Sequence, residues 1–216
     1  METQELSRRY RKKLATRQAL RSAALRLVAE RGYDRVTVED IAEGADVSVR
    51  TLFNHFPSKE DVLVGMDPDR LEDLHCALGA RPADEAPLQT LRVVLSKMSQ
   101  GMAAQRADML AGMRVLQQNP NLRVRQLASF AAFEKMLADT VGERCGLDPD
   151  VDLYPTLTAA AAIAALRAAT TLWLASDGTA PLGELFEDAF EQLAVGLSQP
   201  LPTRASASRR RSVSTG

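Results

Sequence analysis

The sequence predicts an all-α protein with a small N-terminal domain and a larger C-terminal one. Aromatic residues make up 5% and hydrophobic residues 45% of the 216 positions, and runs of β-branched residues, which strands favour, are absent. The apolar residues recur at helical spacing in long segments rich in alanine and leucine. A chain of this length fits one small domain followed by a larger one.

The first part of the chain is strongly basic. Residues 7 to 26 contain no acid, although the whole chain has a formal net charge of only −1. Such a patch contacts DNA phosphates and supplies salt-sensitive affinity without reading sequence. A solvated helix face or a disordered leader is the alternative, and we expect residues 1–13 to form a basic flexible arm. The basic residues are Arg8, Arg9, Arg11, Lys12, Lys13, Arg17, Arg21 and Arg26.

Two short helices with a tight turn between them are predicted between Thr37 and Lys59. Thr37 and Asp40 have the spacing of a capping box, and apolar residues follow at the offsets of one helix face. Ser48 caps the second helix, and Pro57 ends it because proline disfavours a helical residue before it. This arrangement is typical of a helix-turn-helix that reads DNA.

The second of these helices has an apolar face and a hydrogen-bonding face. Arginine suits guanine, asparagine suits adenine, threonine a thymine methyl or a phosphate, and histidine a phosphate or a base edge. A solvated polar face is the more common interpretation of one isolated helix, but two capped helices in tandem favour DNA reading. The apolar face comprises Val49, Leu52, Phe53 and Phe56, and the polar face comprises Arg50, Thr51, Asn54 and His55.

Residues 25–63 (LRLVAERGYDRVTVEDIAEGADVSVRTLFNHFPSKEDVL) resemble the DNA-binding domain of the TetR family of bacterial transcriptional regulators. The resemblance implies a TetR-like fold, with a three-helix DNA-binding domain at residues 14–58 and an effector-binding and dimerisation domain at residues 59–198. Asp46 stands where the family usually has a turn glycine, and aspartate tolerates the left-handed conformation better than most residues. The DNA contacts expected from the resemblance and the basic patch are Arg17, Thr37, Ser48, Val49, Arg50, Thr51, Phe53, Asn54, His55 and Lys59.

The C-terminal domain is expected to consist of helices separated by loops rich in glycine, proline and asparagine. Ser58 and Asp61 open a helix that we expect to run from Lys59 to Leu78 and to act as the lever between the two domains. The tail at residues 199–216 is basic and serine-rich and is predicted to be disordered. The remaining helices are predicted at residues 87–104, 105–118, 122–145, 150–175 and 181–197.

The last two predicted helices have small or apolar faces. Arg167 is the only basic residue between Arg144 and Arg204, in a segment that is mostly alanine. The family resemblance implies that these helices pair with those of a second subunit in a four-helix bundle, and a dimer would read a palindromic operator. A membrane span is the competing interpretation, which Arg167 and the weak apolarity of alanine disfavour.

Residues 85–145 are expected to form the effector-binding body. Methionine suits a cavity for a flexible apolar ligand because its unbranched chain repacks, although core filling is the common role of any one methionine. Residues 116–141, 160–175 and 181–193 resemble the TetR subgroup with an acyl-CoA-like ligand-binding domain, related to mycofactocin-system regulators. The candidate ligand-binding residues are Met98, Met102, Met109, Met113, Phe130, Phe133, Met136 and Arg167.

Arg167 allows two interpretations. A guanidinium within an uncharged helix needs a partner when it is buried, so it could pair with a carboxylate of a neighbouring helix. It could instead hold the anionic end of a ligand. The candidate carboxylates are those of Asp108, Glu134 and Asp139.

Other chemistry has little support in the sequence. The chain has two histidines and two cysteines and no catalytic triad, phosphate loop or HExxH motif, so we expect no enzyme, metal or cofactor. The basic N-terminus lacks an apolar stretch behind it, and two isolated cysteines suit a reducing cytoplasm. The predicted function is a ligand-responsive homodimeric repressor that leaves its operator when a small apolar or acyl-type effector binds. An effector-independent repressor, a redox regulator acting through Cys76 or Cys145, and a helical enzyme or interaction module are the alternatives.

Overall fold

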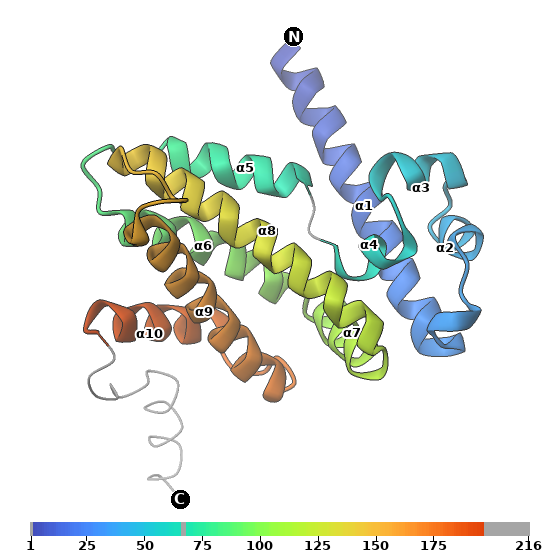
Figure 1. Ribbon diagram of the computed structural model, residues 1–216. Helices are drawn as coiled ribbons and strands as arrows, with labels where there is room; N and C mark the ends of the chain where they lie inside the picture. Colours follow the sequence, from blue (N-terminus) through green and yellow to red (C-terminus); the bar gives the residue numbers. More distant parts are fainter. Residues whose placement is uncertain (1, 66–67, 197–216) are drawn as a thin grey trace, which may run out of the picture. The chain divides into compact units, whose positions relative to one another are not determined.

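The computed structural model describes residues 2–65 and 68–196, and within them the chain is helical with no strand. The described chain divides into two compact units (Figure 1). Unit 1 contains residues 2–65 and 107–129, and unit 2 contains residues 68–106 and 130–196. The predicted all-α fold is confirmed, while the expected tail at residues 199–216 lies outside the described residues.

Unit 1 is built on a long first helix. In chain order it contains α1 (Glu2–Arg31), the 3₁₀ helix η1 (Tyr33–Arg35), α2 (Val38–Gly44), α3 (Val49–His55) and α4 (Lys59–Val64). Helix α1 packs against η1, α2 and α4, and α2 packs against α3. Most of α7 (Arg106–Gln118) and the start of α8 (Pro120–Cys145) complete the unit.

The core of unit 1 explains why its limits differ from the expected division at residue 58. Val62 and Leu63 of α4 are buried in the same core as Leu20 of α1, so α4 belongs with the DNA-reading helices. Val115 of α7 and Leu122 of α8 join that core from much later in the chain. Residues 2–13, which belong to the segment expected as a flexible arm, are instead helical and form the start of α1.

The helix expected from Lys59 to Leu78 is wrong as a single element. The chain ends α4 at Val64 and resumes in α5 (Pro68–Gly79). Gly65 has extended backbone angles (φ −66°, ψ 143°), which end α4. A Cβ atom on Gly65 would lie 2.5 Å from the carbonyl oxygen of Asp61, which is too close for any other residue. The backbone can therefore turn out of α4 in this conformation only with glycine at position 65.

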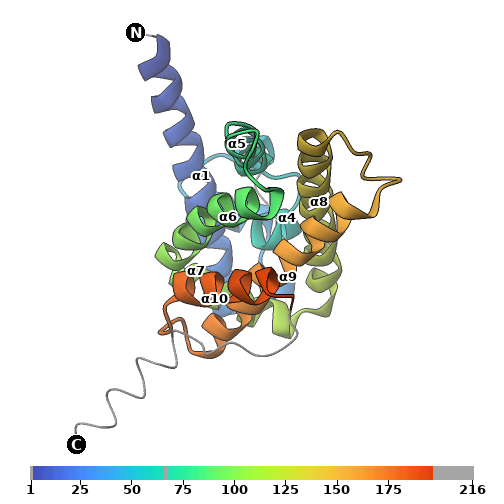
Figure 2. The ribbon, with the colours of Figure 1, turned by 90° about the vertical axis from the view of Figure 1, so that its left-hand side faces the viewer.

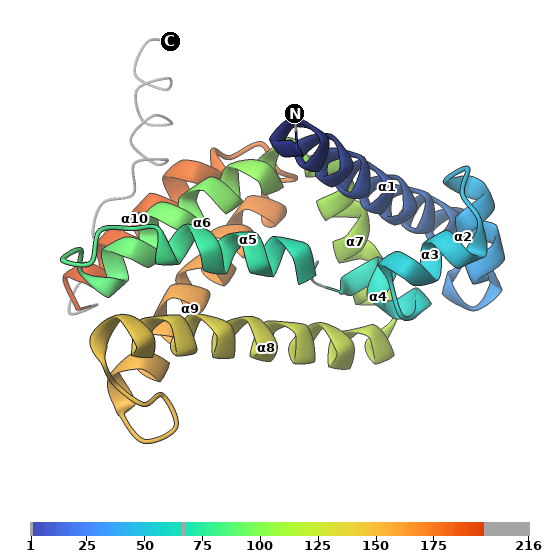
Figure 3. The same ribbon diagram turned by 90° about the horizontal axis from the view of Figure 1, so that it is seen from above.

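Unit 2 is a helical bundle with an aromatic core. It contains α5, α6 (Pro87–Ala104), α9 (Leu153–Ala175), α10 (Leu182–Ala194) and the remainder of α8. Helix α10 packs against α6 and α9 (Figure 2), and α6 lies between α5 and α10 (Figure 3). Phe133, Trp173, Phe186 and Phe190 are almost completely buried, with 4.7 Å between the ring centroids of the last two.

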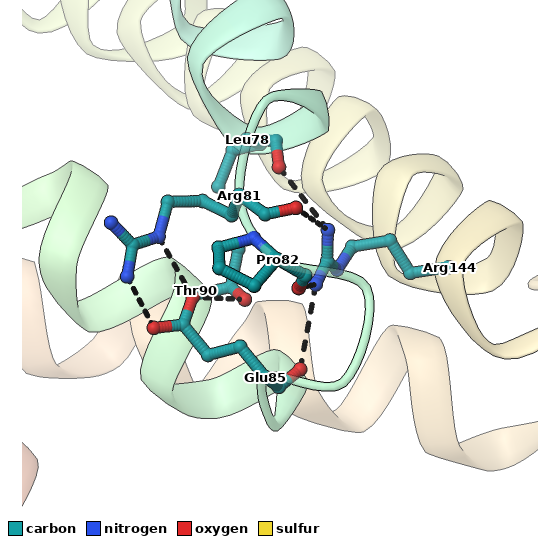
Figure 4. Close-up of polar contacts among 6 residues, drawn as sticks. All are labelled: Leu78, Arg81, Pro82, Glu85, Thr90 and Arg144. Atoms are coloured by element: carbon teal, nitrogen blue, oxygen red, sulfur yellow. Dashed lines mark hydrogen bonds and ion pairs between the residues drawn. The ribbon is translucent and has the colours of Figure 1, made fainter.

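The loop between α5 and α6 is fastened by two arginines (Figure 4). Arg144 of α8 donates from Nη1 to the carbonyls of Leu78 and Arg81 at 3.3 Å, and from Nη2 to those of Pro82 at 2.6 Å and Glu85 at 3.4 Å. The Glu85 carboxylate accepts hydrogen bonds from Arg81 and from Oγ1 of Thr90. The hydrogen bonds from Arg81 are the main reason that the pKa of Glu85 falls to about 2.

Helix α9 is apolar enough to raise the question of a membrane span. Its 23 residues have a mean hydropathy of 1.5 over the most apolar window, of which 44% is buried inside the protein. Length and composition alone are weak support, because core helices of soluble proteins have the same properties. The packing of α9 against α6 and α10 accounts for its buried part.

Candidate nucleic-acid interface

The three helices that present the candidate interface begin at the predicted caps. Oγ1 of Thr37 accepts a hydrogen bond from the backbone N–H of Asp40 at 3.1 Å. In return, the Asp40 carboxylate accepts one from the backbone N–H of Thr37 at 2.8 Å. The hydrogen bond from the Thr37 N–H, followed by one that the Thr37 hydroxyl donates to the same carboxylate, lowers the pKa of Asp40. Oγ of Ser48 accepts from Thr51 N–H at 3.1 Å, and Oγ of Ser58 accepts from Asp61 N–H at 3.2 Å. The predicted caps are therefore confirmed.

The turn between α2 and α3 has the expected conformation. Asp46 has φ +54°, in the left-handed region that glycine usually occupies. The backbone N–H of Val47 donates to the carbonyl of Ala42 at 2.9 Å and so closes the turn. The prediction that aspartate adopts the left-handed conformation at this position is confirmed.

Helix α3 turns two of its four polar side chains outward. Arg50 and Asn54 are exposed, while Thr51 and His55 are half-buried. Leu52 and Phe56 lie in the core, with 0% and 5% of their surface exposed. The apolar-face prediction is wrong for Phe53, which is 51% exposed and lies beside the polar residues, where the family resemblance placed it. Thr37 and Ser48 are exposed and Val49 is half-buried at the starts of α2 and α3.

Lys59 holds α4 against the end of η1. Its Nζ donates to the carbonyls of Tyr33 at 3.0 Å and Val36 at 2.9 Å, and lies 3.9 Å from the centroid of the Tyr33 ring. The Tyr33 hydroxyl donates to Glu60, and partial burial followed by this hydrogen bond raises the pKa of Tyr33. A phosphate contact by Lys59 stays a prediction.

Arg17 occupies a position that the sequence interpretation missed. The side chain is 7% exposed, and its Nη2 donates to the carbonyl of His55 at 2.7 Å. The signal was present in the spacing, because Arg17 precedes Leu20, Ala24 and Leu27 by three, seven and ten residues and therefore shares their buried face. A phosphate contact by this side chain stays a prediction.

Arg125 of α8 contributes to unit 1 from a part of the sequence with no recognisable signal. Its Nε and Nη2 donate to the two carboxylate oxygens of Asp61, each at 2.8 Å. Asp61 is buried in α4 and also accepts from Oγ of Ser58 at 2.7 Å. This bidentate pair fastens the start of α8 to the helix that follows α3.

The eight candidate ligand-binding residues do not all lie in one unit. Met109 and Met113 lie on α7 in unit 1, and the other six lie in unit 2. Phe133 is fully buried, whereas the five methionines and Phe130 are half-buried. Oγ1 of Thr140 donates to the carbonyl of Met136 at 2.8 Å, and Nδ1 of His75 lies 3.1 Å from the same hydroxyl.

Arg167 is exposed on α9. Within the described residues its side chain makes no ion pair, so the predicted structural pairing is absent there. Two of the expected partners are engaged elsewhere, since Asp108 accepts from Oγ of Ser22 at 2.6 Å and Asp139 pairs with Lys135 at 3.1 Å. The exposed guanidinium needs no internal partner.

The two cysteines are exposed free thiols, Cys76 on α5 and Cys145 at the end of α8. Sγ of Cys76 lies 3.9 Å from a carboxylate oxygen of Glu72. Across the two described ranges, no cluster of histidine, cysteine and carboxylate side chains could hold a metal ion.

Comparison with known proteins identifies both parts of the chain. Residues 20–66 match the family described as bacterial regulatory proteins, tetR family, and residues 85–198 match the MftR C-terminal domain. The HTH-type transcriptional regulator TcmR of Streptomyces glaucescens is 35% identical over 193 residues, which cover 86% of this chain and 85% of TcmR. MftR of Mycobacterium tuberculosis, named for the regulation of mycofactocin biosynthesis, is 26% identical over 89% of this chain and 96% of its own.

A solved structure has the same fold over most of the chain. FadR of Thermus thermophilus, a TetR-family repressor crystallised with lauroyl-CoA, matches with a TM-score of 0.53 and 25% identity over 86% of this chain and 98% of its own. These relatives are transcriptional regulators rather than enzymes. With a capped helix-turn-helix in unit 1 and a C-terminal match that spans more than half of the sequence, the chain belongs to the TetR family of DNA-binding transcriptional regulators.

Proposed function

We propose that the protein is a homodimeric repressor that reads a palindromic operator with α3 and releases it when an acyl-CoA-like effector binds unit 2. The outward polar face of α3 carries the proposal. Arg50 and Asn54 are exposed on a helix whose opposite side is buried through Leu52 and Phe56. A helix held in this way can enter the major groove, where arginine and asparagine distinguish guanine and adenine.

The dimer is supported by an apolar stripe on α9. Leu153, Leu157 and Leu172 are 75%, 58% and 59% exposed, and Ala164 and Ala168 are exposed between them on the same face. A stripe of this kind is unfavourable in water and suits an interface between two copies related by a two-fold axis. The pairing would place two copies of α3 on one operator in the cytoplasm, and it offers an account of the apolarity of α9 without a membrane.

The effector class is supported by the C-terminal match and by FadR, whose structure holds lauroyl-CoA. The half-buried methionines Met98, Met102 and Met136 of unit 2 can repack around a flexible acyl chain. Arg167 is exposed and has no ion pair in the described chain, so its guanidinium is available to an anionic group. Met109, Met113, Phe130 and Phe133 remain candidates for the same ligand.

The effector proposal is tested with DNA that the purified protein selects from a random-sequence pool. Fluorescence anisotropy would measure operator affinity with and without acyl-CoA of several chain lengths, with free CoA as the control. We expect one chain-length range to weaken operator binding about 5- to 150-fold. Arg167→Ala should remove this response while leaving operator binding and folding intact. Unchanged affinity across the panel would support an effector-independent repressor instead.

A redox response is the second candidate, favoured by the exposure of both thiols. Oxidation of an accessible thiol adds a polar group and can shift a helix. If this response operates, Cys76→Ser or Cys145→Ser should preserve operator binding in peroxide where the unsubstituted protein loses it. Equal behaviour of all three proteins in peroxide would exclude both thiols as the trigger.

A further inference from the structure

Arg17 is buried although Arg11, Lys12 and Lys13 of the same helix are exposed. Only 7% of the Arg17 surface is accessible. Its Nη2 lies 2.7 Å from the carbonyl oxygen of His55, and the central carbon of its guanidinium lies 4.6 Å from the centroid of the Phe56 ring. One side chain of α1 therefore contacts the last residue of α3 and the residue that follows it.

This contact closes the C-terminal end of α3. The last carbonyls of a helix have no N–H donor within the helix, and Pro57 supplies none. A cation at this end also interacts favourably with the helix dipole. Ser48 closes the other end of α3, so this helix of seven residues is held at its start by a hydroxyl and at its end by a guanidinium.

We propose that Arg17 is a positioning residue for DNA reading, which sets the rotation and depth of α3 in the groove and touches no phosphate itself. The proposal rests on the proposed reading face of α3. A helix of two turns does not hold its own position, so its placement depends on contacts with neighbouring elements. Arg17 grips the end of α3 that carries Asn54 and His55, and a shift there would move both side chains away from their bases.

The first experiment separates this role from a phosphate contact. Arg17→Gln and Arg17→Lys are compared with Lys12→Gln, an exposed control on the same helix, on the selected operator and on an unrelated duplex of equal length. We expect both Arg17 variants to lose about tenfold or more in operator affinity, with nearly unchanged affinity for the unrelated duplex. Their salt dependence should match that of the unsubstituted protein, since no counterion release is lost. Lysine should not rescue binding, because it lacks the planar fork that stacks and donates in fixed directions.

A direct phosphate contact predicts the opposite pattern. The slope of log affinity against log salt would fall by about 0.9 in Arg17→Gln, both duplexes would weaken together, and Arg17→Lys would restore most of the affinity. That result, or operator affinity that neither substitution changes, would overturn the proposal. Thermal melting followed by circular dichroism checks that the variants are folded. If Arg17→Gln does not fold, the comparison is made with Arg17→Lys alone.

The second experiment asks whether Arg17 acts through α3. Mere destabilisation lowers the fraction of active protein and leaves the relative affinities for base-substituted operators unchanged. Displacement of α3 should instead reduce the preference at the bases nearest Asn54, so Asn54→Ala should cost less in the Arg17→Lys background. If the effects of the two substitutions on operator affinity are additive, the Arg17 proposal is contradicted, while the proposed reading face of α3 stands. If Asn54→Ala has no effect in the unsubstituted protein, the reading face itself is wrong, and the proposal fails with it.

Discussion

At the scale of single residues, unit 1 depends on side chains that close the ends of short helices. Helices α2 and α3 have seven residues each and α4 has six, and isolated helices of this length do not form in water. Thr37, Ser48 and Ser58 each satisfy a backbone N–H at a helix start, and Arg17 satisfies a carbonyl at a helix end. Loss of any one of these hydrogen bonds should therefore affect both the folding of unit 1 and the reading of DNA by α3.

Ser48→Ala should lower the free energy of unfolding by about 1 kcal/mol, because the N–H of Thr51 loses its acceptor. Urea unfolding followed by circular dichroism would measure the loss. Gln18→Ala, at an exposed position of α1, is the control and should change the value by less than about 0.5 kcal/mol. Equal values for the two variants would show that the Ser48 cap does not contribute.

Glu85 should make the stability of unit 2 depend on acidity. Its pKa is about 2 in the folded protein against 4.5 ordinarily, chiefly because Arg81 donates hydrogen bonds to the carboxylate. A lowered folded-state pKa gives stabilisation that is fully present above pH 4.5 and is lost as the pH falls towards 2. Glu85→Gln should lack this part of the pH dependence, as measured by melting temperature between those two values. Parallel curves for the two proteins would contradict the role given to Glu85.

At the scale of elements, the sequence predicts the helices whose limits are fixed by local chemistry. The starts of α2, α3 and α4 follow from Thr37, Ser48 and Ser58, and the limits of α6 coincide with the prediction because Pro87 opens it. The division between α4 and α5 was missed, since it depends on Gly65 closely approaching Asp61. A cap is marked by the type of its side chain, whereas glycine is compatible with several backbone conformations and does not by itself mark the end of a helix.

The candidate DNA-binding residues likewise divide into those that the sequence predicts and those that it does not. The outward positions of Arg50 and Asn54 follow from the helical period of α3. The carbonyl partner of Arg17 and the pair between Arg125 and Asp61 do not follow from the sequence, because these residues are 38 and 64 positions from their partners. Long-range polar contacts of this kind need the folded chain to identify them.

Arg125→Ala should destabilise unit 1 by about 1 to 2 kcal/mol. The substitution leaves the Asp61 side chain, which is 11% exposed, without its bidentate partner, while the 49% exposure of Arg125 reduces the effect. Lys135→Ala is the matched control, because the pair of Lys135 with Asp139 is 64% and 42% exposed and should contribute about 0 to 0.5 kcal/mol. Urea unfolding of the two variants measures the difference, and equal losses would refute the special role of Asp61.

At the scale of the whole molecule, the apolar stripe of α9 predicts the oligomeric state. Leu157→Glu places a charge in the middle of the stripe, where a second copy would have to bury it. Sedimentation should then change from the mass of a dimer to the 23.5 kDa of one chain, with weaker operator binding because one α3 contacts each DNA molecule. Thr171→Glu, at an exposed position near the margin of the stripe, should have the smaller effect. A dimer unaffected by Leu157→Glu would place the interface elsewhere.

The central claim is that α3 reads operator sequence through its outward polar face. The most direct measurement is the affinity of Asn54→Ala for the selected operator, for operators with single base substitutions and for an unrelated duplex. We predict that operator affinity falls at least about fivefold, that one base position loses its preference, and that affinity for the unrelated duplex is unchanged. Operator affinity and base preferences equal to those of the unsubstituted protein, in Asn54→Ala and likewise in Arg50→Ala, would contradict the account.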